Sequence, residues 1–432
     1  MNPKIQQDMK IVCTSDWHLG NLFHGNDRLP EHKHFLAWLL AKIKEQQPDA
    51  LLIAGDIFDN GNPSAAAQAA YYEFLAEATE ACPDMNVVII AGNHDSASRL
   101  EAPRALLTRH KVEVRGNIHR SWVANGEDGK WVIDYDDLMI PIHGDDGLQA
   151  IVLTVPYLRS DVVQNANYSE GVNAILRELT AKARGKYGDL PLIMMAHMYA
   201  KGADIAQHDA SEKIIIGGQE EVNMQGWDEH PDYFTCGHIH KRQYIWNTDW
   251  AHYSGSVLPM SFAEKDYHHG VDLVIIEHGT KPRLDFLEYE PQHKLVILPE
   301  TEEELTPKKL KKRINAELQD RNAGKLDDNF VYLVLKVTLE KVNNDAIKEL
   351  EALIDTKNAV LCKIQKIVPE LDIATISGSQ HLQSIDDILN RNPLDTLRET
   401  FAVKNGKEMT EHQEKMLTDL LNSITAENDN AQ

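Results

Sequence analysis

Five short apolar runs along the chain share one arrangement: a strand-like stretch, then a small residue, then a polar residue able to bind a metal. The runs cover residues 11–13, 51–55, 87–92, 192–196 and 233–237. Because apolar residues follow one another almost without interruption, we expect strands that are buried on both faces. Helical patterns lie between several runs, at 34–46 and 64–81. Strand–helix–strand order of this kind predicts an α/β core, in which ligands gather beyond the carboxyl ends of the strands.

The arrangement stops near residues 289–291, where a smaller module begins. A helix is expected from Thr306-Pro307, since proline is tolerated at an early helical position. Period-2 and period-3.6 patterns then predict a small α+β domain with a strand, a helix and a strand at 331–339, 346–354 and 359–368.

Two amphipathic helices are expected near the C-terminus, and Thr410 with Gln413 forms a plausible capping box for the second. Neither helix buries its apolar face alone, so the two either pack back on this protein or dock on another chain. The predicted parts are therefore a first domain, a small α+β domain and C-terminal helices, at 1–288, 289–376 and 380–427.

The length of 432 residues predicts two or three domains. No run approaches the roughly 18 uninterrupted apolar residues that a membrane helix needs, and the first ten residues lack the basic flank and apolar stretch of a secretory signal. A cytoplasmic protein without membrane contact is expected. The four cysteines form no CxxC pair, which argues against a zinc knuckle or a redox dithiol, and Cys13 and Cys236 are expected to be buried thiols.

The chain is acidic, with 67 Asp and Glu against 44 Lys and Arg and a formal charge of −23. This balance argues against a simple electrostatic DNA binder, because phosphate contacts need Lys and Arg. If DNA is the substrate, basic residues must cluster locally or a partner must supply much of the grip. Candidates near the polar strand ends are Arg28, Arg99, Lys201, Lys241 and Arg242. The basic run 308–313 either binds along the phosphate backbone of DNA or is a solvated helix face.

The polar residues after the five runs form a metal-ligand set: two carboxylates, one amide oxygen and four imidazoles. They are Asp16, His18, Asp56, Asn93, His197, His238 and His240. The i, i+2 spacing of Asp16 with His18, and of His238 with His240, places each pair on one face of an extended backbone. Oxygen and nitrogen ligands without thiolate suit Mn²⁺, Fe²⁺ or Zn²⁺. Seven ligands are too many for one metal and suit two, with Asp56 as a bridge, about 3.5–4 Å apart around a phosphate diester.

His94 follows Asn93 directly and is expected beside the metals rather than among their ligands. A protonated imidazole there would donate to the departing oxygen as a general acid. Asp59 is expected to hold this imidazole as its carboxylate partner, although a turn residue before Asn60 is the plainer interpretation. Asp95 is expected to be local scaffolding. Each motif alone is more often a turn or a buried histidine, and the prediction rests on five in order.

The motifs SDWHLG (15–20), AGDIFD (54–59), AGNHDS (91–96), AH (196–197) and GHIH (237–240) resemble those of the calcineurin-like metallophosphoesterases. The flanking motifs TSDWHLG, VPYLR (155–159) and GSVLPMSF (255–262) resemble the SbcD branch of the Mre11-type nucleases. The resemblance covers essentially the whole chain. It implies a layered α/β/β/α sandwich followed by a small α+β cap domain and C-terminal helices.

The resemblance also implies how the ligands divide. One metal would be held by Asp16, His18, Asp56 and His240, and the other by Asp56, Asn93, His197 and His238. His94 would be the catalytic histidine and Asp59 its partner. Two departures, Val257 and Met260, flank the site, and Asn60-Gly61 replaces the Arg-containing motif of the phosphatase branch.

For function, the resemblance implies a DNA nuclease of repair and recombination. Its members cut duplex ends as 3′→5′ exonucleases and cut hairpins or single strands as endonucleases. They prefer Mn²⁺, with Mg²⁺, Fe²⁺ or Zn²⁺ open. They form homodimers within a heterotetramer, binding an SMC-like ABC ATPase (the SbcC and Rad50 type) through the C-terminal helices, at the nucleoid. A metallophosphatase or small-molecule phosphodiesterase with the same metals, and a non-catalytic scaffold, remain the alternatives.

Overall fold

The structure is a computed structural model of the chain. It describes residues 8–367 apart from 126–127, 145–146, 164, 166, 206–220, 225–226, 277–279, 301–304 and 339–341. The helices expected over 380–427 lie outside the described residues. Within the described part, no helix combines the length and the apolar character that crossing a membrane requires.

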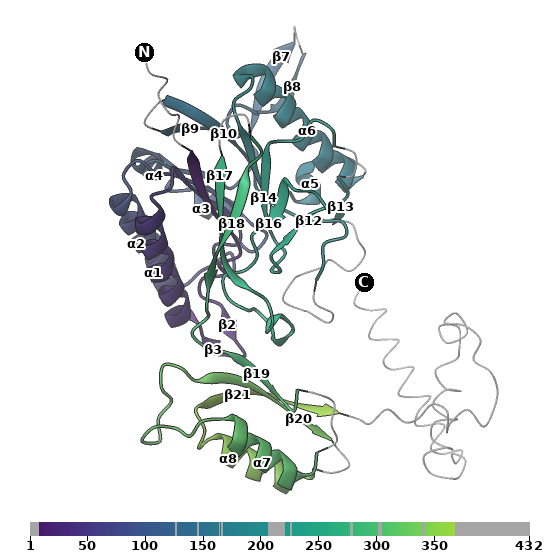
Figure 1. The fold of residues 1–432 in the computed structure, drawn as a ribbon. Helices are drawn as coiled ribbons and strands as arrows, with labels where there is room; N and C mark the ends of the chain where they lie inside the picture. The colour runs from purple at the N-terminus through teal and green to yellow at the C-terminus, as the bar shows by residue number, and fades with distance from the viewer. Residues whose placement is uncertain are drawn as a thin grey trace, which may run out of the picture. The chain divides into compact units, whose positions relative to one another are not determined.

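The first of two six-stranded sheets carries three of the five predicted strands at its centre (Figure 1). Its strand order is β18-β17-β1-β4-β5-β6, in which β1, β4, β5 and β6 are parallel, β17 pairs antiparallel with β1, and β18 pairs antiparallel with β17. The strands are β1 (Met9–Thr14), β4 (Ala50–Ala54), β5 (Asn86–Ile90), β6 (Val112–Arg115), β17 (His269–Ile276) and β18 (Arg283–Tyr289).

The second sheet carries the other two predicted strands, β11 and β14, side by side and parallel. Its order is β15-β16-β14-β11-β10-β9. The strands are β9 (Met139–Gly144), β10 (Gly147–Val155), β11 (Leu192–His197), β14 (Tyr233–Gly237), β15 (Gln243–Tyr244) and β16 (Ala251–Tyr253).

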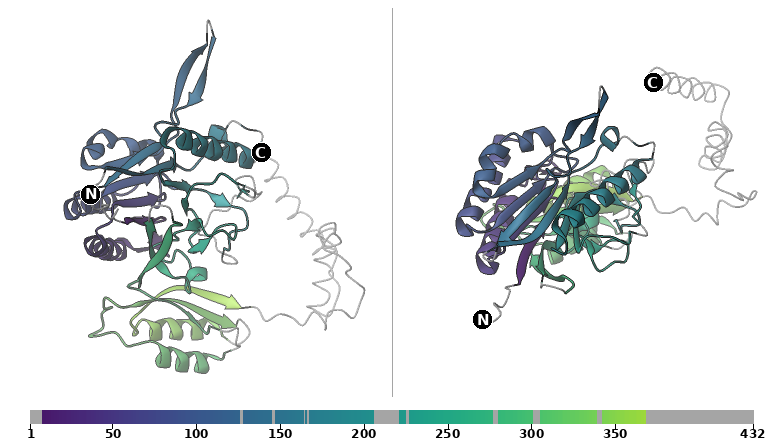
Figure 2. Two further views of the ribbon diagram at one scale, coloured as in Figure 1. Left: turned by 45° about the horizontal axis from the view of Figure 1, so that its top comes forward. Right: turned by 90° about the horizontal axis from the view of Figure 1, so that it is seen from above.

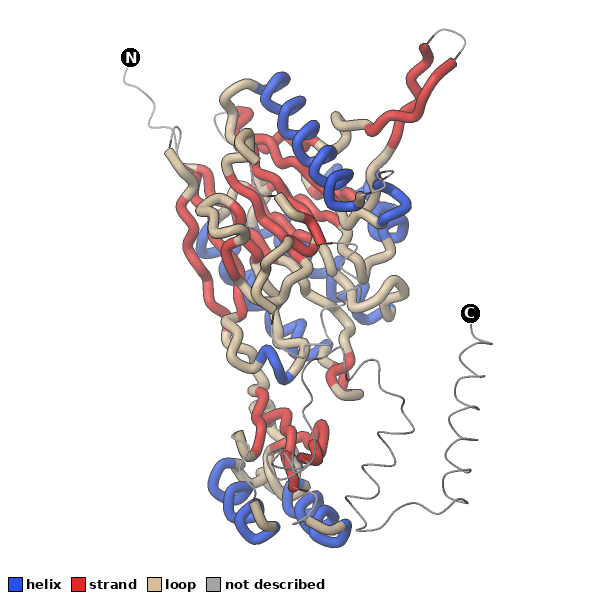
Figure 3. The backbone as a smooth tube through the Cα atoms, turned by 90° about the vertical axis from the view of Figure 1, so that its right-hand side faces the viewer, coloured by secondary structure: helices blue, strands red, loops and turns tan. Residues whose placement is uncertain are grey.

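Alternate residues of the central strands enter two different hydrophobic cores, which explains their uninterrupted apolar runs. In β1, Ile11 and Cys13 face a core shared with Ile193 and Met195 of the second sheet, whereas Val12 packs with the helices of the first. Helices cover the outer face of each sheet. This is the expected α/β/β/α sandwich, and Figure 3 shows the strands between helices.

Helices α1 (Leu29–Gln46) and α2 (Ala65–Ala81) cover the first sheet, and α6 (Tyr168–Tyr187) covers the second. The sequence predicted the second helix closely, with Ser64 as its N-cap accepting from the amide of Ala67. It placed the start of α1 at residue 34, five residues late. The first turn carries Glu31 and His32, polar residues that are buried and therefore do not show as an apolar stripe.

Short elements fill the connections. A hairpin of β7 (Arg120–Asn125) and β8 (Asp128–Ile133) projects from the sandwich, as the left view of Figure 2 shows. The remaining elements are β2 (Leu22–Phe23), β3 (Asn26–Asp27), α3 (Ala97–Glu101), α4 (Arg104–Leu107), η1 (Thr108–His110), α5 (Ser160–Val163), β12 (Tyr199–Ala200), β13 (Glu221–Val222) and η2 (Phe262–Glu264).

A smaller three-stranded parallel sheet follows, with its own core. Each strand is joined to the next by a helix, and α7 and α8 contribute Leu310, Ile314, Leu350 and Ile354 to that core. We call these residues, 295–367, the cap. Its elements are β19 (Leu295–Leu298), α7 (Pro307–Glu317), β20 (Val331–Thr338), α8 (Asn344–Ile354) and β21 (Ala359–Ile367).

Candidate metal centre

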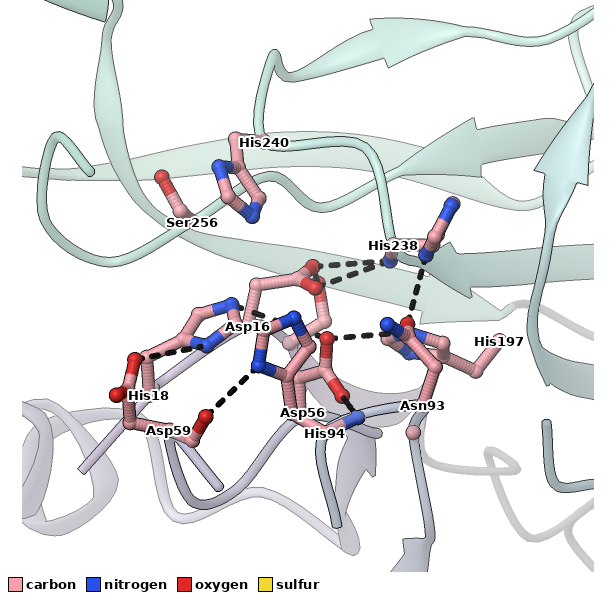
Figure 4. Close-up of polar contacts among 12 residues, drawn as sticks. Asp16, His18, Asp56, Asp59, Asn93, His94, His197, His238, His240 and Ser256 are labelled. Atoms are coloured by element: carbon pink, nitrogen blue, oxygen red, sulfur yellow. Dashed lines mark hydrogen bonds and ion pairs between the residues drawn. The ribbon is translucent and has the colours of Figure 1, made fainter. Parts of the chain in front are cut away.

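The carboxyl ends of five strands from both sheets bring the predicted ligands together, as Figure 4 shows. Asp16 and His18 follow β1, Asp56 follows β4, and Asn93 follows β5. On the second sheet, His197 ends β11, and the loop after β14 carries two histidines, His238 and His240. The two sheets thus contribute opposite walls of one site.

The ligand-bearing loops use backbone conformations that residues other than glycine rarely adopt. Asp16, His18 and Asp56 have φ values of 52°, 49° and 50°, and His238 has 100°. The expected extended backbone at the i, i+2 pairs is therefore wrong. Tight turns place these side chains, and the amide of Asp16 donates to Gly55 O at 3.0 Å to fix the first turn. Such strain costs about 1–3 kcal/mol per residue and clusters at functional sites.

Three glycines next to the ligands are required by close packing. A Cβ on Gly92 would lie 2.1 Å from Oδ1 of Asp56, and one on Gly55 would lie 2.3 Å from Nδ1 of His197. A Cβ on Gly237 would lie 2.1 Å from the carbonyl oxygen of Ala54. The glycines that precede the predicted ligands therefore leave room, by lacking a side chain, for a predicted ligand or a backbone oxygen of a neighbouring segment.

One group of possible ligand atoms comes from Asp16, His18 and His240, which lie within 4.8 Å of one another. Nε2 of His18 also lies 3.8 Å from Oδ2 of Asp56. His18 is buried, yet neither of its ring nitrogens has a hydrogen-bond partner in the described part of the chain. An unsatisfied buried imidazole is costly, and a cation bound at this point would satisfy it.

The second group surrounds His197, whose Nδ1 donates to the carbonyl oxygen of Ala54 at 2.8 Å. This bond leaves Nε2 facing the site, 3.3 Å from Oδ2 of Asp56 and 3.0 Å from Oδ1 of Asn93. Nδ1 of His238 lies 2.9 Å from the same amide oxygen. Four donor atoms therefore converge. Asp56 approaches His18 as well as His197, and a carboxylate oxygen of Asp16 also lies within 4.8 Å of the ligand atoms of Asp56 and His197.

Burial and mutual charge shift the titration of these ligands in opposite directions. Burial raises the pKa of Asp16 and lowers the pKa of His238 to about 3. For His197, burial lowers the pKa but the carboxylate of Asp56 outweighs it, giving a pKa of about 9. Burial likewise raises the pKa of Asp56, and the His197 imidazolium reverses the effect and holds that pKa low. A proton on His197 thus occupies a position that suits a divalent cation.

His94 lies beside this set and is held by the backbone rather than by a carboxylate. Its Nδ1 donates to the carbonyl oxygen of Asp59 at 2.8 Å, and its amide donates to Oδ1 of Asp56 at 2.8 Å. In this structure the hydrogen bond to Nδ1 of His94 thus comes from the backbone of Asp59 rather than from the expected carboxylate, although that carboxylate lies within 4.8 Å of a His94 ring nitrogen. The Asp59 carboxylate accepts from Nδ2 of Asn21 and lies 3.8 Å from Nδ1 of His18.

Asp95 has the scaffolding role expected of it. Its carboxylate accepts from the amides of Ile57, Phe58 and Gly92 at 3.1, 3.0 and 2.9 Å. These bonds tie the turn after β4 to the turn after β5. Burial raises the pKa of Asp95 to about 6.

The structure removes one proposed DNA contact. Arg28 is fully buried, and its guanidinium is engaged by Glu31 and by the carbonyl oxygen of Pro259. Lys241 pairs with an aspartate, and Arg242 donates to Asp272 at 2.7 Å. On α7, Lys311 pairs with Glu349. Much of the candidate basic charge is therefore neutralised within the chain.

Sequence reasoning missed Glu264, which is completely buried. Its Oε1 accepts from Nδ1 of His240 at 2.9 Å, so Nε2 of His240 faces the ligand cluster. Outer-shell carboxylates of this kind orient a ligating imidazole and raise its basicity. The sequence signal was its position two residues after the end of the motif GSVLPMSF.

The donor set, the orphaned nitrogens of His18 and the oriented rings of His197 and His240 all fit divalent cations. Residues 9–242 match the family model described as calcineurin-like phosphoesterase. The chain is 36% identical to the SbcD component of the nuclease SbcCD from Rhodobacter capsulatus over 286 residues, covering 64% of this chain and 68% of the relative. It is 29% identical to the SbcD component of the nuclease SbcCD from Escherichia coli K12, covering 67% and 70%.

Among solved structures, the chain resembles a dimetal phosphatase from Danio rerio, with 10% identity, a TM-score of 0.32, and coverage of 64% of this chain and 98% of that one. The family match covers more than half of the chain, and the first relative is matched over two thirds of its length. The chain therefore belongs to the calcineurin-like phosphoesterase family and, within it, to the metal-dependent nucleases of the SbcD type.

Proposed function

We propose that this chain cleaves phosphodiester bonds of DNA at a centre of two divalent cations, with Mn²⁺ preferred. The observation that carries the proposal is the position of Oδ2 of Asp56, 3.8 Å from Nε2 of His18 and 3.3 Å from Nε2 of His197. One carboxylate thus faces an imidazole from each ligand group. Asp16, His18, Asp56 and His240 hold one cation, and Asp56, Asn93, His197 and His238 hold the other.

When bound, two such cations polarise the phosphate, activate water and stabilise the departing oxygen. The chain's own residues orient the predicted ligands and shield them from solvent. His197 and His240 present Nε2 because Ala54 O and Glu264 occupy their Nδ1 atoms. The buried walls keep these rings from turning, so the site is organised before substrate arrives.

His94 is the proposed general acid. Its Nδ1–H is committed to the carbonyl oxygen of Asp59, which leaves Nε2 as the atom that passes a proton to the departing oxygen. The edge of its ring contacts His18, with ring centroids 4.8 Å apart, so it lies beside one ligand group. Asp59 supports this ring through its backbone, which modifies the role first expected for its side chain.

DNA is proposed over a small ester for two reasons. The relatives at 36% and 29% identity are named nucleases, and this chain adds the cap, a βαβ-type module that single-ester hydrolysis does not require. We propose 3′→5′ exonuclease activity on duplex ends and endonuclease activity on hairpins or single strands, in DNA repair and recombination. The alternative is a metallophosphatase or small-molecule phosphodiesterase.

The substrate test uses the Mn²⁺-loaded full chain with end-labelled linear duplex, hairpin DNA, a nucleotide monoester and a small phosphodiester. The proposal predicts shortening of the duplex from its 3′ ends and opening of the hairpin. Omitting metal and adding a chelator is the matched control. Turnover of the monoester or small diester, with both DNA substrates intact, would establish the alternative.

We further propose that the chain works as a homodimer with an SMC-like ABC ATPase. The relatives are named as one component of the nuclease SbcCD, which supports a partner. The formal charge of −23 supports a second chain that provides part of the DNA-binding surface, because phosphate contacts need Lys and Arg. The docking segment is 380–427, outside the described residues. Deleting residues 380–432 should abolish co-elution with the ATPase while metal binding persists, and unchanged co-elution would contradict this assignment.

A further inference from the structure

A buried ion pair lies between the sandwich and the cap. Arg28 donates from Nε and Nη2 to the two carboxylate oxygens of Glu31, at 2.9 and 2.8 Å. Both side chains are almost completely buried, with exposed fractions of 0% and 1%. Burying two charges is costly unless their remaining hydrogen bonds are also made, so the further partners of this pair define its role.

One partner belongs to the cap. The hydroxyl of Tyr332, on β20, donates to Oε1 of Glu31 at 2.9 Å, and this side chain is 1% exposed. Phe23 packs on the same group, with the Arg28 guanidinium 5.0 Å from its ring and the Tyr332 ring 5.0 Å away. The cap is therefore anchored to the ion pair by a charge-assisted hydrogen bond in a dry environment.

The other partner leads to the metal centre. Nη1 of Arg28 donates to the carbonyl oxygen of Pro259 at 2.5 Å. The nitrogen of that same peptide group, on Met260, donates to Oε2 of Glu264 at 2.8 Å. Oε1 of Glu264 accepts from Nδ1 of His240 at 2.9 Å. One planar peptide thus links the ion pair to the carboxylate that orients His240.

We infer that the cap positions the metal ligand His240 through this series of contacts, which we call the relay. Its members are Tyr332, Glu31, Arg28, the Pro259–Met260 peptide and Glu264. The inference rests on the proposed function, because it takes His240 as a ligand. Glu264 and Tyr332 are positioning residues: neither lies among the ligand atoms, and both act through His240. A shift of the cap therefore changes the orientation and the basicity of the His240 imidazole.

Among the described residues, the hydrogen bonds of the relay lead directly to one of the two ligand groups. In the group around His197, Nδ1 of the imidazole donates to the carbonyl oxygen of Ala54, within the first sheet. That contact involves no carboxylate and no cap residue. The cation beside His240 should therefore respond more strongly to changes in the cap than the cation beside His197, which is linked to the relay only through the shared ligand Asp56.

The test is a double-mutant cycle on metal affinity in the full-length chain, using Tyr332→Phe and Glu264→Gln. Mn²⁺ binding is followed by calorimetry and by electron paramagnetic resonance, and His240→Gln identifies the site that contains this ligand. A glutamine at 264 disrupts the relay because its amide nitrogen cannot accept, so it satisfies Met260 or His240 but not both. Glu264→Gln should weaken Mn²⁺ at the His240 site about 10- to 100-fold.

Tyr332→Phe removes one hydroxyl and should weaken the same site about 3- to 10-fold. In the Glu264→Gln background it should have no further effect, because the relay is already broken. The His197 site should change less than the His240 site in Tyr332→Phe, in Glu264→Gln and in the double variant. The matched control is Tyr289→Phe, which removes another hydroxyl, bonded to Nδ1 of His34 at 2.8 Å, that is not part of the relay.

The outcomes separate the two proposals. If the wild-type chain fails to bind two Mn²⁺ ions, or His240→Gln keeps both at full affinity, the proposed metal centre itself is wrong. If the wild type binds two ions and Tyr332→Phe matches Tyr289→Phe, the relay is wrong and the centre stands. Additive effects of Tyr332→Phe and Glu264→Gln would also overturn the relay, since independent contacts add.

Discussion

Nδ1 of His94 donates to the backbone carbonyl of Asp59 at 2.8 Å, and the carboxylate of Asp59 turns instead toward Asn21. The proposed general acid is therefore oriented by a part of the chain that no side-chain substitution removes. This arrangement separates the role of the imidazole from the role of the carboxylate, and each can be tested alone.

His94→Asn should keep both metal ions while lowering DNA cleavage roughly 100- to 10,000-fold, the usual contribution of a positioned general acid. The ring is lost, but the amide of residue 94 still donates to Asp56. Single-turnover cleavage and Mn²⁺ stoichiometry measure the two effects. His268→Asn, at an exposed histidine paired with Glu288, is the control. Loss of metal from the His94 variant would show that His94 is a ligand.

Asp59→Asn should reduce cleavage only slightly, by about threefold or less, because the backbone carbonyl that orients His94 remains and the side-chain oxygen of the asparagine still accepts from Nδ2 of Asn21. The measurement is the same single-turnover assay, read beside His94→Asn. A loss as large as that of the histidine variant would restore the carboxylate–histidine pair that the sequence suggested.

The sequence predicted the sandwich, and the meeting of seven polar residues at one place, because both follow from a repeated pattern of apolar run and polar residue. Alternation of residues between two cores gives the continuous apolar run of β1, and each run ends in a polar residue. It could not predict that Asp16 and His18 adopt positive φ values. An extended backbone and a tight turn can each bring residues i and i+2 to the same site, so the spacing alone does not distinguish them. Arg28 was wrongly predicted to contact DNA, because its charge alone does not reveal that it is buried in an ion pair with Glu31.

Contacts between distant segments were also invisible in one sequence. Glu264 follows His240 by 24 residues, and Tyr332 follows Glu31 by 301. Neither separation has a period that a pattern could detect. The role of Gly92 was hidden for a related reason, because the space it leaves is filled by Asp56 from another strand.

Gly92→Ala should weaken Mn²⁺ binding about 10-fold or more and lower the free energy of unfolding by about 1–3 kcal/mol, since the added Cβ would lie 2.1 Å from Oδ1 of Asp56. Calorimetric titration and chemical denaturation measure the two. The matched control is Gly185→Ala in α6, where a Cβ meets nothing within 4 Å, and helix propensity predicts about 0.5–1 kcal/mol of stabilisation. Equal behaviour of the variants would contradict the close packing.

Metal loading at pH 7 should release about one proton. Asp56 raises the pKa of His197 to about 9, above the ordinary 6.5, so the metal-free ring carries a proton that the cation must displace. His238 contributes none, because burial lowers its pKa to about 3 and it is already neutral. Apparent affinity should therefore fall about tenfold for each unit that the pH falls below 9. Calorimetry in two buffers of different ionisation enthalpy measures the release, and equal heats would contradict it.

The most direct measurement is a crystal structure of the Mn²⁺-loaded chain with anomalous scattering from the metal. We predict two peaks about 3.5–4 Å apart, with Asp56 contacting both. Asp16, His18 and His240 should complete one coordination shell, and Asn93, His197 and His238 the other. A single peak, or two peaks with several of these seven side chains turned away, would contradict the proposed centre.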